Sequence, residues 1–146
     1  MEGKVRVSVM THTAVGELTD VLHFVGRGLL HATESGWHLR YQVRCTDEES
    51  GELISAGVLL DRIARRAVLQ GRLVDTELCA DRPTELRLAG SPEVLTAVTH
   101  SLSWQLDGPE AGYIDMKYTL LQRAEAVTTL HVRMEVTQDF NSREHS

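Results

Sequence analysis

Apolar and polar side chains alternate without a break from Trp37 to Cys45. A period of two is the pattern of a β-strand that buries one face and exposes the other. The same alternation returns over residues 5–9, 114–120 and 130–136. The sequence therefore predicts a sheet in which each of these strands contributes one face to a core.

Two segments carry mixed signals. Residues 53–68 contain good helix formers, but Gly57 and the Asp61-Arg62 step suit a hairpin equally well. Residues 91–102 open with Ser91-Pro92-Glu93, which is typical of a helix start. Their β-branched residues also form an alternating row that continues to Trp104. These local patterns leave both segments open between helix and strand.

The chain has 146 residues, which favours one domain. We expect that domain to span residues 1–137, followed by a polar tail over 138–146 that frays. No βαβ rhythm and no long-period repeat is found. Short alternating strands at hairpin spacing are typical of an antiparallel sandwich or barrel.

The stretches Leu39-Arg40-Tyr41 and Gly112 to Leu120, together with the loop lengths between them, resemble the YwiB-like family of bacterial proteins of uncharacterised function. The resemblance covers roughly residues 5–136. It implies an all-β fold, a calycin- or lipocalin-like antiparallel β-barrel of about eight to ten strands with little helix. It also implies that residues 94–102 form a strand, and it carries no catalytic signature.

Charge and apolar patterning limit the partners and the location of the protein. The formal net charge is −6, which opposes general binding to nucleic acid. Arg62, Arg65, Arg66 and Arg72 lie close together, but no aromatic residue separates them, so we interpret them as a solvated hairpin face. The longest apolar run, near 58–60, is too short to span a membrane, and the N-terminus lacks a signal sequence. We expect a cytoplasmic protein.

The residue types that usually carry catalysis are not grouped into a known site. The seven histidines and the two cysteines lack metal-ligand spacing, and the acidic residues 47–51 lack the pattern of a calcium loop. No Gly-x-Ser-x-Gly or glycine-rich phosphate motif occurs. We predict a non-catalytic protein without metal or cofactor. The alternative is an enzyme that uses His100 with an inward carboxylate or tyrosine.

Large side chains share the inward rows of the predicted strands, and a barrel of this size either fills its interior or holds one small ligand. Our hypothesis is an apolar ligand inside the barrel. The candidate binding residues are Trp37, Tyr41, His100, Trp104 and Tyr118. The alternative is that these side chains simply complete the core.

A second hypothesis concerns interaction with another protein chain. Residues 53–60 place apolar groups on both faces of one predicted strand, so we expect a partner to cover the outer face. The partner is a second copy, which would give a homodimer, or another protein. The candidate interface residues are Ile54, Val58 and Leu60.

Overall fold

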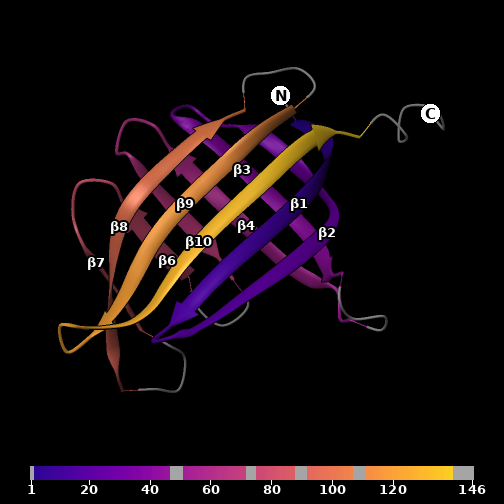
Figure 1. Ribbon diagram of the computed structural model, residues 1–146. Coiled ribbons are helices and arrows are strands. Elements are labelled where there is room, and N and C mark those ends of the chain that lie inside the picture. The colour runs from indigo at the N-terminus through magenta and orange to yellow at the C-terminus, as the bar shows by residue number, and fades with distance from the viewer. Residues whose placement is uncertain (1, 47–50, 72–74, 88–91, 107–110, 140–146) are drawn as a thin grey trace.

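A computed structural model describes residues 2–46, 51–71, 75–87, 92–106 and 111–139 of the chain (Figure 1). Within these residues the chain forms ten strands and no helix. The strands are β1 (Glu2–Val15), β2 (Leu18–Ala32), β3 (Gly36–Cys45), β4 (Ile54–Asp61), β5 (Arg66–Gln70), β6 (Asp75–Cys79), β7 (Thr84–Arg87), β8 (Val94–Gln105), β9 (Ala111–Gln122) and β10 (Glu125–Gln138).

All ten strands belong to one antiparallel sheet, in the order β6-β5-β4-β3-β2-β1-β10-β9-β8-β7. Consecutive strands pair with each other except β6 and β7, and β1 also pairs with β10, so the first and last strands lie side by side. The sheet curls until its two edges approach each other (Figure 1). The predicted all-β antiparallel barrel is confirmed. Both ambiguous segments are strands, the first as the β4–β5 hairpin and the second as β8.

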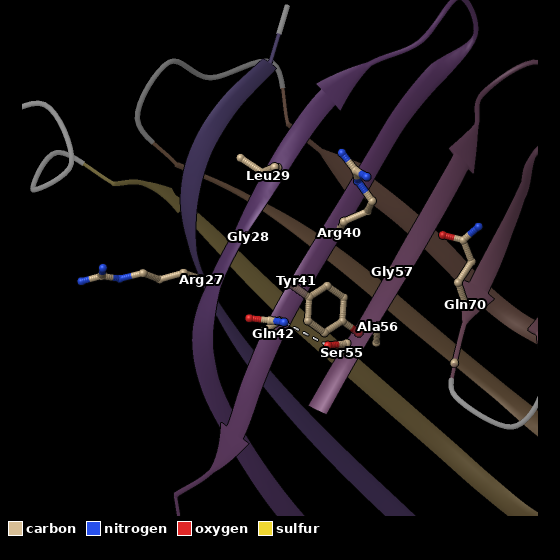
Figure 2. A pocket seen from close by; sticks show the side chains of 11 residues that line it. Arg27, Gly28, Leu29, Arg40, Tyr41, Gln42, Ser55, Ala56, Gly57 and Gln70 are labelled. Atoms are coloured by element: carbon tan, nitrogen blue, oxygen red, sulfur yellow. Dashed lines mark hydrogen bonds between the residues drawn. The ribbon is translucent and has the colours of Figure 1, made fainter. Parts of the chain in front are cut away.

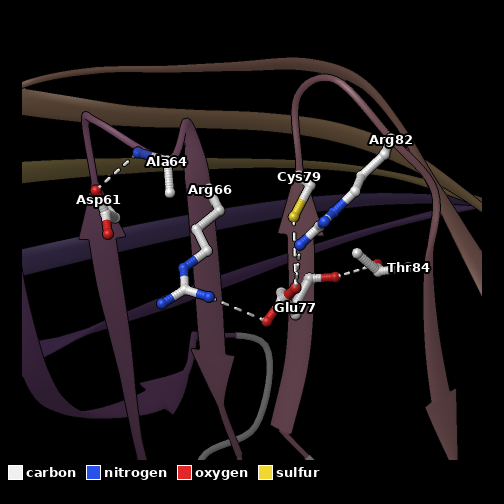
Figure 3. Close-up of polar contacts among 7 residues, drawn as sticks. All are labelled: Asp61, Ala64, Arg66, Glu77, Cys79, Arg82 and Thr84. Carbon is white, nitrogen blue, oxygen red and sulfur yellow. Dashed lines mark hydrogen bonds and ion pairs between the residues drawn. The ribbon is translucent and has the colours of Figure 1, made fainter.

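The two edge strands, β6 and β7, meet at a seam held by side chains (Figure 3). The Thr84 hydroxyl donates a hydrogen bond to the backbone carbonyl of Glu77. The carboxylate of Glu77 forms ion pairs with Arg66, at 3.5 Å, and with Arg82, at 3.9 Å. The Thr84–Glu77 hydrogen bond therefore links β7 to β6 where a continuous ladder is missing, whereas Arg66 lies on β5 and Arg82 between β6 and β7. The barrel is nearly closed.

The core fills the barrel with the inward rows that the alternation predicted. Leu39, Val58, Leu78, Ile114 and Met116 are fully buried. Partly buried aromatic and aliphatic residues pack around them and extend the core toward both ends of the barrel. Burial of one face per strand is the main source of stability in such a sheet.

Gly26 and Gly28 on β2 lie very close to the backbone of the paired strand β3. A Cβ at Gly26 would lie 1.9 Å from the carbonyl oxygen of Gln42, and one at Gly28 would lie 2.3 Å from that of Arg40. The sequence allowed a sharp bend or a bulge here. The register of β2 with both β1 and β3 instead runs through these glycines without a break.

An irregularity in β8 changes which side chains face inward. The register with β9 shifts between Thr99 and Ser101, so His100 is an extra residue in the strand. A β-bulge reverses the alternation on its two sides. Leu102 packs against the core, whereas His100 is exposed. Before the bulge, Leu95 and Ala97 face the core. The single inward row expected over residues 94–104 is therefore wrong from Val94 to His100 and correct at Leu102 and Trp104.

The sheet ends slightly later than the sequence indicated. Gln138 is the last residue of β10, and the Asp139 N–H donates to the carbonyl of Lys4 at 3.0 Å. The rest of the expected tail, residues 140–146, lies outside the described residues, as do residues 47–50 and Arg72. Within the described part of the chain, no helix is long and apolar enough to cross a membrane.

Candidate ligand-binding site

A cavity of about 330 Å³, open to solvent, is lined by residues of β1 to β6, β9 and β10. Most of its wall is apolar. The lining side chains include Val9, Phe24, Val43, Ile54, Leu69, Leu130, Val132 and Met134, and the polar ones are Thr11, Tyr41, Gln70, Thr76 and Tyr118. None of the described lining residues is charged. The wall therefore suits an uncharged molecule, because burying an unpaired charge here is costly.

Tyr41 and Tyr118 are the main polar groups of this cavity. Burial raises the pKa of Tyr41 to about 12, with a further contribution from the neighbouring Tyr118. Burial also raises the pKa of Tyr118. Neither hydroxyl has a hydrogen-bond partner among the described residues. A phenol in such surroundings stays protonated at neutral pH, and its hydroxyl, which is not sealed from solvent, can donate to a group that enters the cavity.

Of the five predicted binding residues, only Tyr41 and Tyr118 line the barrel cavity. Trp37 lies four residues before Tyr41 on β3, which is about 13 Å along the strand. Trp104 lies at the same end of the barrel as Trp37, and both line a different hollow. His100 is on the outer face, where its Nε2 lies 2.7 Å from the Thr119 hydroxyl.

The predicted interface residues occupy two different environments. Val58 is fully buried and Leu60 is 3% exposed, so both side chains belong to the core and cannot contact a partner. Ile54 is 42% exposed and lies at the rim of the barrel cavity. Ile54 therefore belongs to the same inward row as Val58 and Leu60, and the apolar residue on the outer face of β4 is the partly buried Leu59.

Sequence reasoning missed two large contributors to the cavity wall. Leu130 lies on an inward row that the alternation predicted, but the predicted ligand contacts comprise tryptophan, tyrosine and histidine side chains and no aliphatic one. Phe24 shares its face of β2 with Gly26 and Gly28, which have no side chains. The sequence therefore shows no apolar row that would mark Phe24 as inward-facing. A search along whole inward rows would have found Leu130 but not Phe24.

A wider hollow of about 530 Å³ lies over β2 to β5 and adjoins the barrel cavity, with which it shares Tyr41, Ala56, Gly57, Gln70 and Gly71 (Figure 2). Its side chains are mostly polar. Gln42 donates a hydrogen bond to the Ser55 hydroxyl at 3.1 Å, and the Gln70 side-chain oxygen accepts one from His38 Nε2 at 2.9 Å. Gly57 pairs with Arg40 on β3 and with Gln70 on β5. It has no side chain to fill the space between these two residues. This hollow is open and solvated.

A polar network lies on the outer face of β9 and β10. His131 Nε2 is 3.0 Å from Asp115, and Arg133 donates to the same carboxylate at 3.2 Å. The Arg133 guanidinium also lies 4.4 Å from the centre of the Tyr113 ring. Within the described residues no group of histidine, cysteine or acidic side chains has the arrangement of a metal site.

Comparisons with known proteins agree with the fold. No protein-family model and no curated protein matches the sequence significantly. Among solved structures, the crystal structure of the ywiB protein from Bacillus subtilis is similar, with a TM-score of 0.67 and 15% sequence identity. The match covers 92% of each chain. The chain therefore has the YwiB-like fold that its sequence predicts.

Proposed function

We propose that this protein binds a small, uncharged and mainly apolar molecule inside the barrel. The observation that carries the proposal is the pair of buried phenols, Tyr41 and Tyr118, whose hydroxyls lack protein partners beside a cavity without charged walls. A volume of about 330 Å³ is at the small end of the range for ligand pockets, about 300–1,000 Å³.

Binding would follow from ordinary desolvation. The apolar wall removes the body of the ligand from water, which contributes about 25 cal/mol per Å² of apolar surface. The two phenol O–H groups then donate to an acceptor on the ligand, such as a carbonyl or ether oxygen. One polar contact in an apolar site fixes orientation and selects against molecules without the acceptor.

A matched set of probes tests this proposal by isothermal titration calorimetry. Acetophenone carries a carbonyl acceptor, α-methylstyrene has the same shape without the acceptor, and benzoate carries a charge. We expect acetophenone to bind most tightly. Tyr41→Phe or Tyr118→Phe should weaken its binding several-fold, whereas Tyr113→Phe, on the outer face, should not.

The cavity itself is tested by filling it. Ala56 lines the cavity, and Ala56→Leu adds three carbon atoms to its wall. We expect this variant to fold and to lose affinity for both uncharged probes. Equal affinity of wild type and Ala56→Leu, or no binding of either uncharged probe to the wild type, would refute a site inside the barrel.

We propose self-association as a second candidate function, because apolar side chains lie along an unpaired strand edge. The β2–β3 ladder begins at Phe24, so within the described chain residues 18–22 pair only with β1. Leu18 is 77% exposed and Val21 is 48% exposed. An edge of this kind pairs readily with a second copy of itself. Light scattering on wild type and Val21→Lys tests this, and a monomeric wild type at micromolar concentration would exclude it.

A further inference from the structure

Two arginines stand on a rigid turn at the barrel end opposite the Tyr41 cavity. The turn, residues 62–65, joins β4 to β5. The Arg62 N–H donates to the Ser35 carbonyl at 2.8 Å, and the Arg65 carbonyl accepts from the Ala80 N–H at 2.9 Å. The turn is therefore tied to both neighbouring loops, and its two guanidinium groups start from fixed positions.

The acidic residue nearest in sequence to these arginines is engaged in the turn itself. The Asp61 carboxylate accepts a hydrogen bond from the Ala64 N–H at 3.0 Å (Figure 3). This hydrogen bond holds the pKa of Asp61 below its ordinary value, with smaller contributions from Ile63, Arg66 and Ser35. Neither Arg62 nor Arg65 forms an ion pair with any residue in the described ranges. Their charges are available to a ligand.

Two hollows of about 280 Å³ each adjoin at this turn. Arg62 and Trp104 line both of them. Trp37 lines one and Arg65 lines the other. The fold thus places both tryptophans of the chain beside two unpaired guanidinium groups, although these residues come from three separate segments.

This arrangement leads to a different interpretation of the arginine cluster over residues 62–72. The cluster was interpreted as a solvated face because no aromatic residue lies within it, but β3 and β8 supply the aromatic rings from elsewhere in the chain. A guanidinium binds carboxylate or phosphate through paired N–H donors, and an indole ring stacks on planar groups. The net charge of −6 repels long polyanions, so a small anion fits better than a nucleic acid.

We propose that the two adjoining hollows, which share Arg62 and Trp104 and include Arg65 on one side and Trp37 on the other, together bind one small planar anion, namely an aromatic ring that carries a carboxylate or a phosphate. The ring packs against the indoles, and the anionic group reaches the two guanidinium groups. This site is independent of the barrel cavity, which has no charged side chain in its described wall. The two proposals can therefore fail separately.

Three aromatic probes of similar shape, together with inorganic phosphate, test this site by calorimetry at low ionic strength. They are 1-naphthyl phosphate, 1-naphthoate, the neutral 1-naphthamide and inorganic phosphate. We expect at least one aromatic anion to bind at least tenfold more tightly than both the amide and inorganic phosphate. The ranking of the first two probes identifies the preferred anionic group. Equal affinity for the amide and both anions, or no binding of either anion, overturns the proposal.

Variants on the exposed turn locate the binding. Arg62→Gln removes one guanidinium from a side chain that is exposed, so the fold should be retained. We expect its affinity for the preferred anion to fall at least tenfold. Arg44→Gln, an equally exposed change on the outer face of β3, is the matched control and should bind like wild type. Unchanged affinity of Arg62→Gln contradicts the site.

The two indole N–H signals in a ¹⁵N–¹H correlation spectrum give an independent readout, because the chain has two tryptophans. We expect both signals to shift on addition of the preferred anion and to stay in place on addition of acetophenone. The cavity-filling variant Ala56→Leu should show the same anion-induced shifts as wild type. Loss of these shifts in Ala56→Leu, or anion binding that moves neither indole signal, would assign the anion to another place.

Discussion

Tyr41 on β3 and Tyr118 on β9 lie close enough inside the barrel for the second phenol to raise the pKa of the first. Their strands are not neighbours, because β2, β1 and β10 stand between them in the sheet. The pair therefore exists only because the sheet curls. Alternation in the sequence predicted that each tyrosine points inward, and closure of the barrel determines that they meet.

The buried phenols should make the protein lose stability at alkaline pH. Tyr41 ionises near pH 10 in the unfolded chain, whereas burial raises its pKa to about 12 in the fold. Between these values the unfolded chain releases a proton that the folded chain keeps, so rising pH favours unfolding. The stability that Tyr41 contributes is thus present below pH 10 and declines up to about pH 12.

Absorbance at 295 nm measures the phenolate directly. With three tyrosines in the chain, wild type should show one transition near pH 12 that is missing from Tyr41→Phe. Urea unfolding of Tyr41→Phe should show a smaller loss of stability between pH 10 and 12 than wild type. Identical alkaline titrations of the two proteins would contradict the burial of this hydroxyl.

The close approach of the paired strands β2 and β3 should not tolerate a side chain at Gly26. The Cβ of Gly26→Ala would lie 1.9 Å from the Gln42 carbonyl oxygen, and that oxygen belongs to the backbone of a paired strand. Because the strand itself must shift, we expect a destabilisation of about 3 kcal/mol or more in urea unfolding.

Gly3→Ala is the matched control for this substitution. Gly3 also lies in a strand, and nothing stands within 4 Å of its added Cβ. We expect its stability to stay within about 0.5 kcal/mol of wild type. Equal stability of the Gly26 and Gly3 variants would show that β2 and β3 do not approach as closely as the structure has them.

The seam between β6 and β7 should depend on the hydroxyl of Thr84. Thr84→Val keeps the shape of this buried side chain but removes the donor to the Glu77 carbonyl. We expect a loss of about 1–2 kcal/mol in the free energy of unfolding, since one hydrogen bond disappears and its acceptor is left without the partner.

Thr19→Val serves as the comparison for the seam, because Thr19 is exposed on β2. It should change stability by less than about 0.5 kcal/mol. Glu77→Gln should cost less than Thr84→Val, since its ion pairs are solvent-exposed pairs worth about 0–1 kcal/mol each. A larger loss of stability in Glu77→Gln than in Thr84→Val would mean that the ion pairs of Glu77, and not the Thr84 hydroxyl, stabilise this part of the sheet.

Much of the fold was accessible from the sequence because burial of one face imposes a period of two. The row from Trp37 to Cys45 and the row from Ile114 to Leu120 keep that period in the structure. His100 was misplaced because one extra residue in β8 reverses the alternation, and neighbouring side chains give no sign of it. A bulge depends on the partner strand, which a single alternating row does not contain.

The candidate sites were less accessible, since they combine residues that are distant in the chain. Trp37 and Trp104 stand on inward rows as predicted, yet they meet Arg62 and not Tyr41. Which end of a barrel a residue occupies depends on the hairpin lengths and the stagger between strands. The alternation gives the face of each side chain and leaves its height along the barrel undetermined.

His100 offers a test of the catalytic alternative and of the bulge together. Its ring lies outside the barrel, where Nε2 is 2.7 Å from the Thr119 hydroxyl. That hydroxyl keeps a second partner, Thr129, at 3.2 Å. We therefore expect His100→Ala to cost less than about 1 kcal/mol in urea unfolding and to leave acetophenone binding unchanged. A loss of affinity in His100→Ala comparable to that in Tyr41→Phe would place the imidazole inside the cavity and contradict the register of β8.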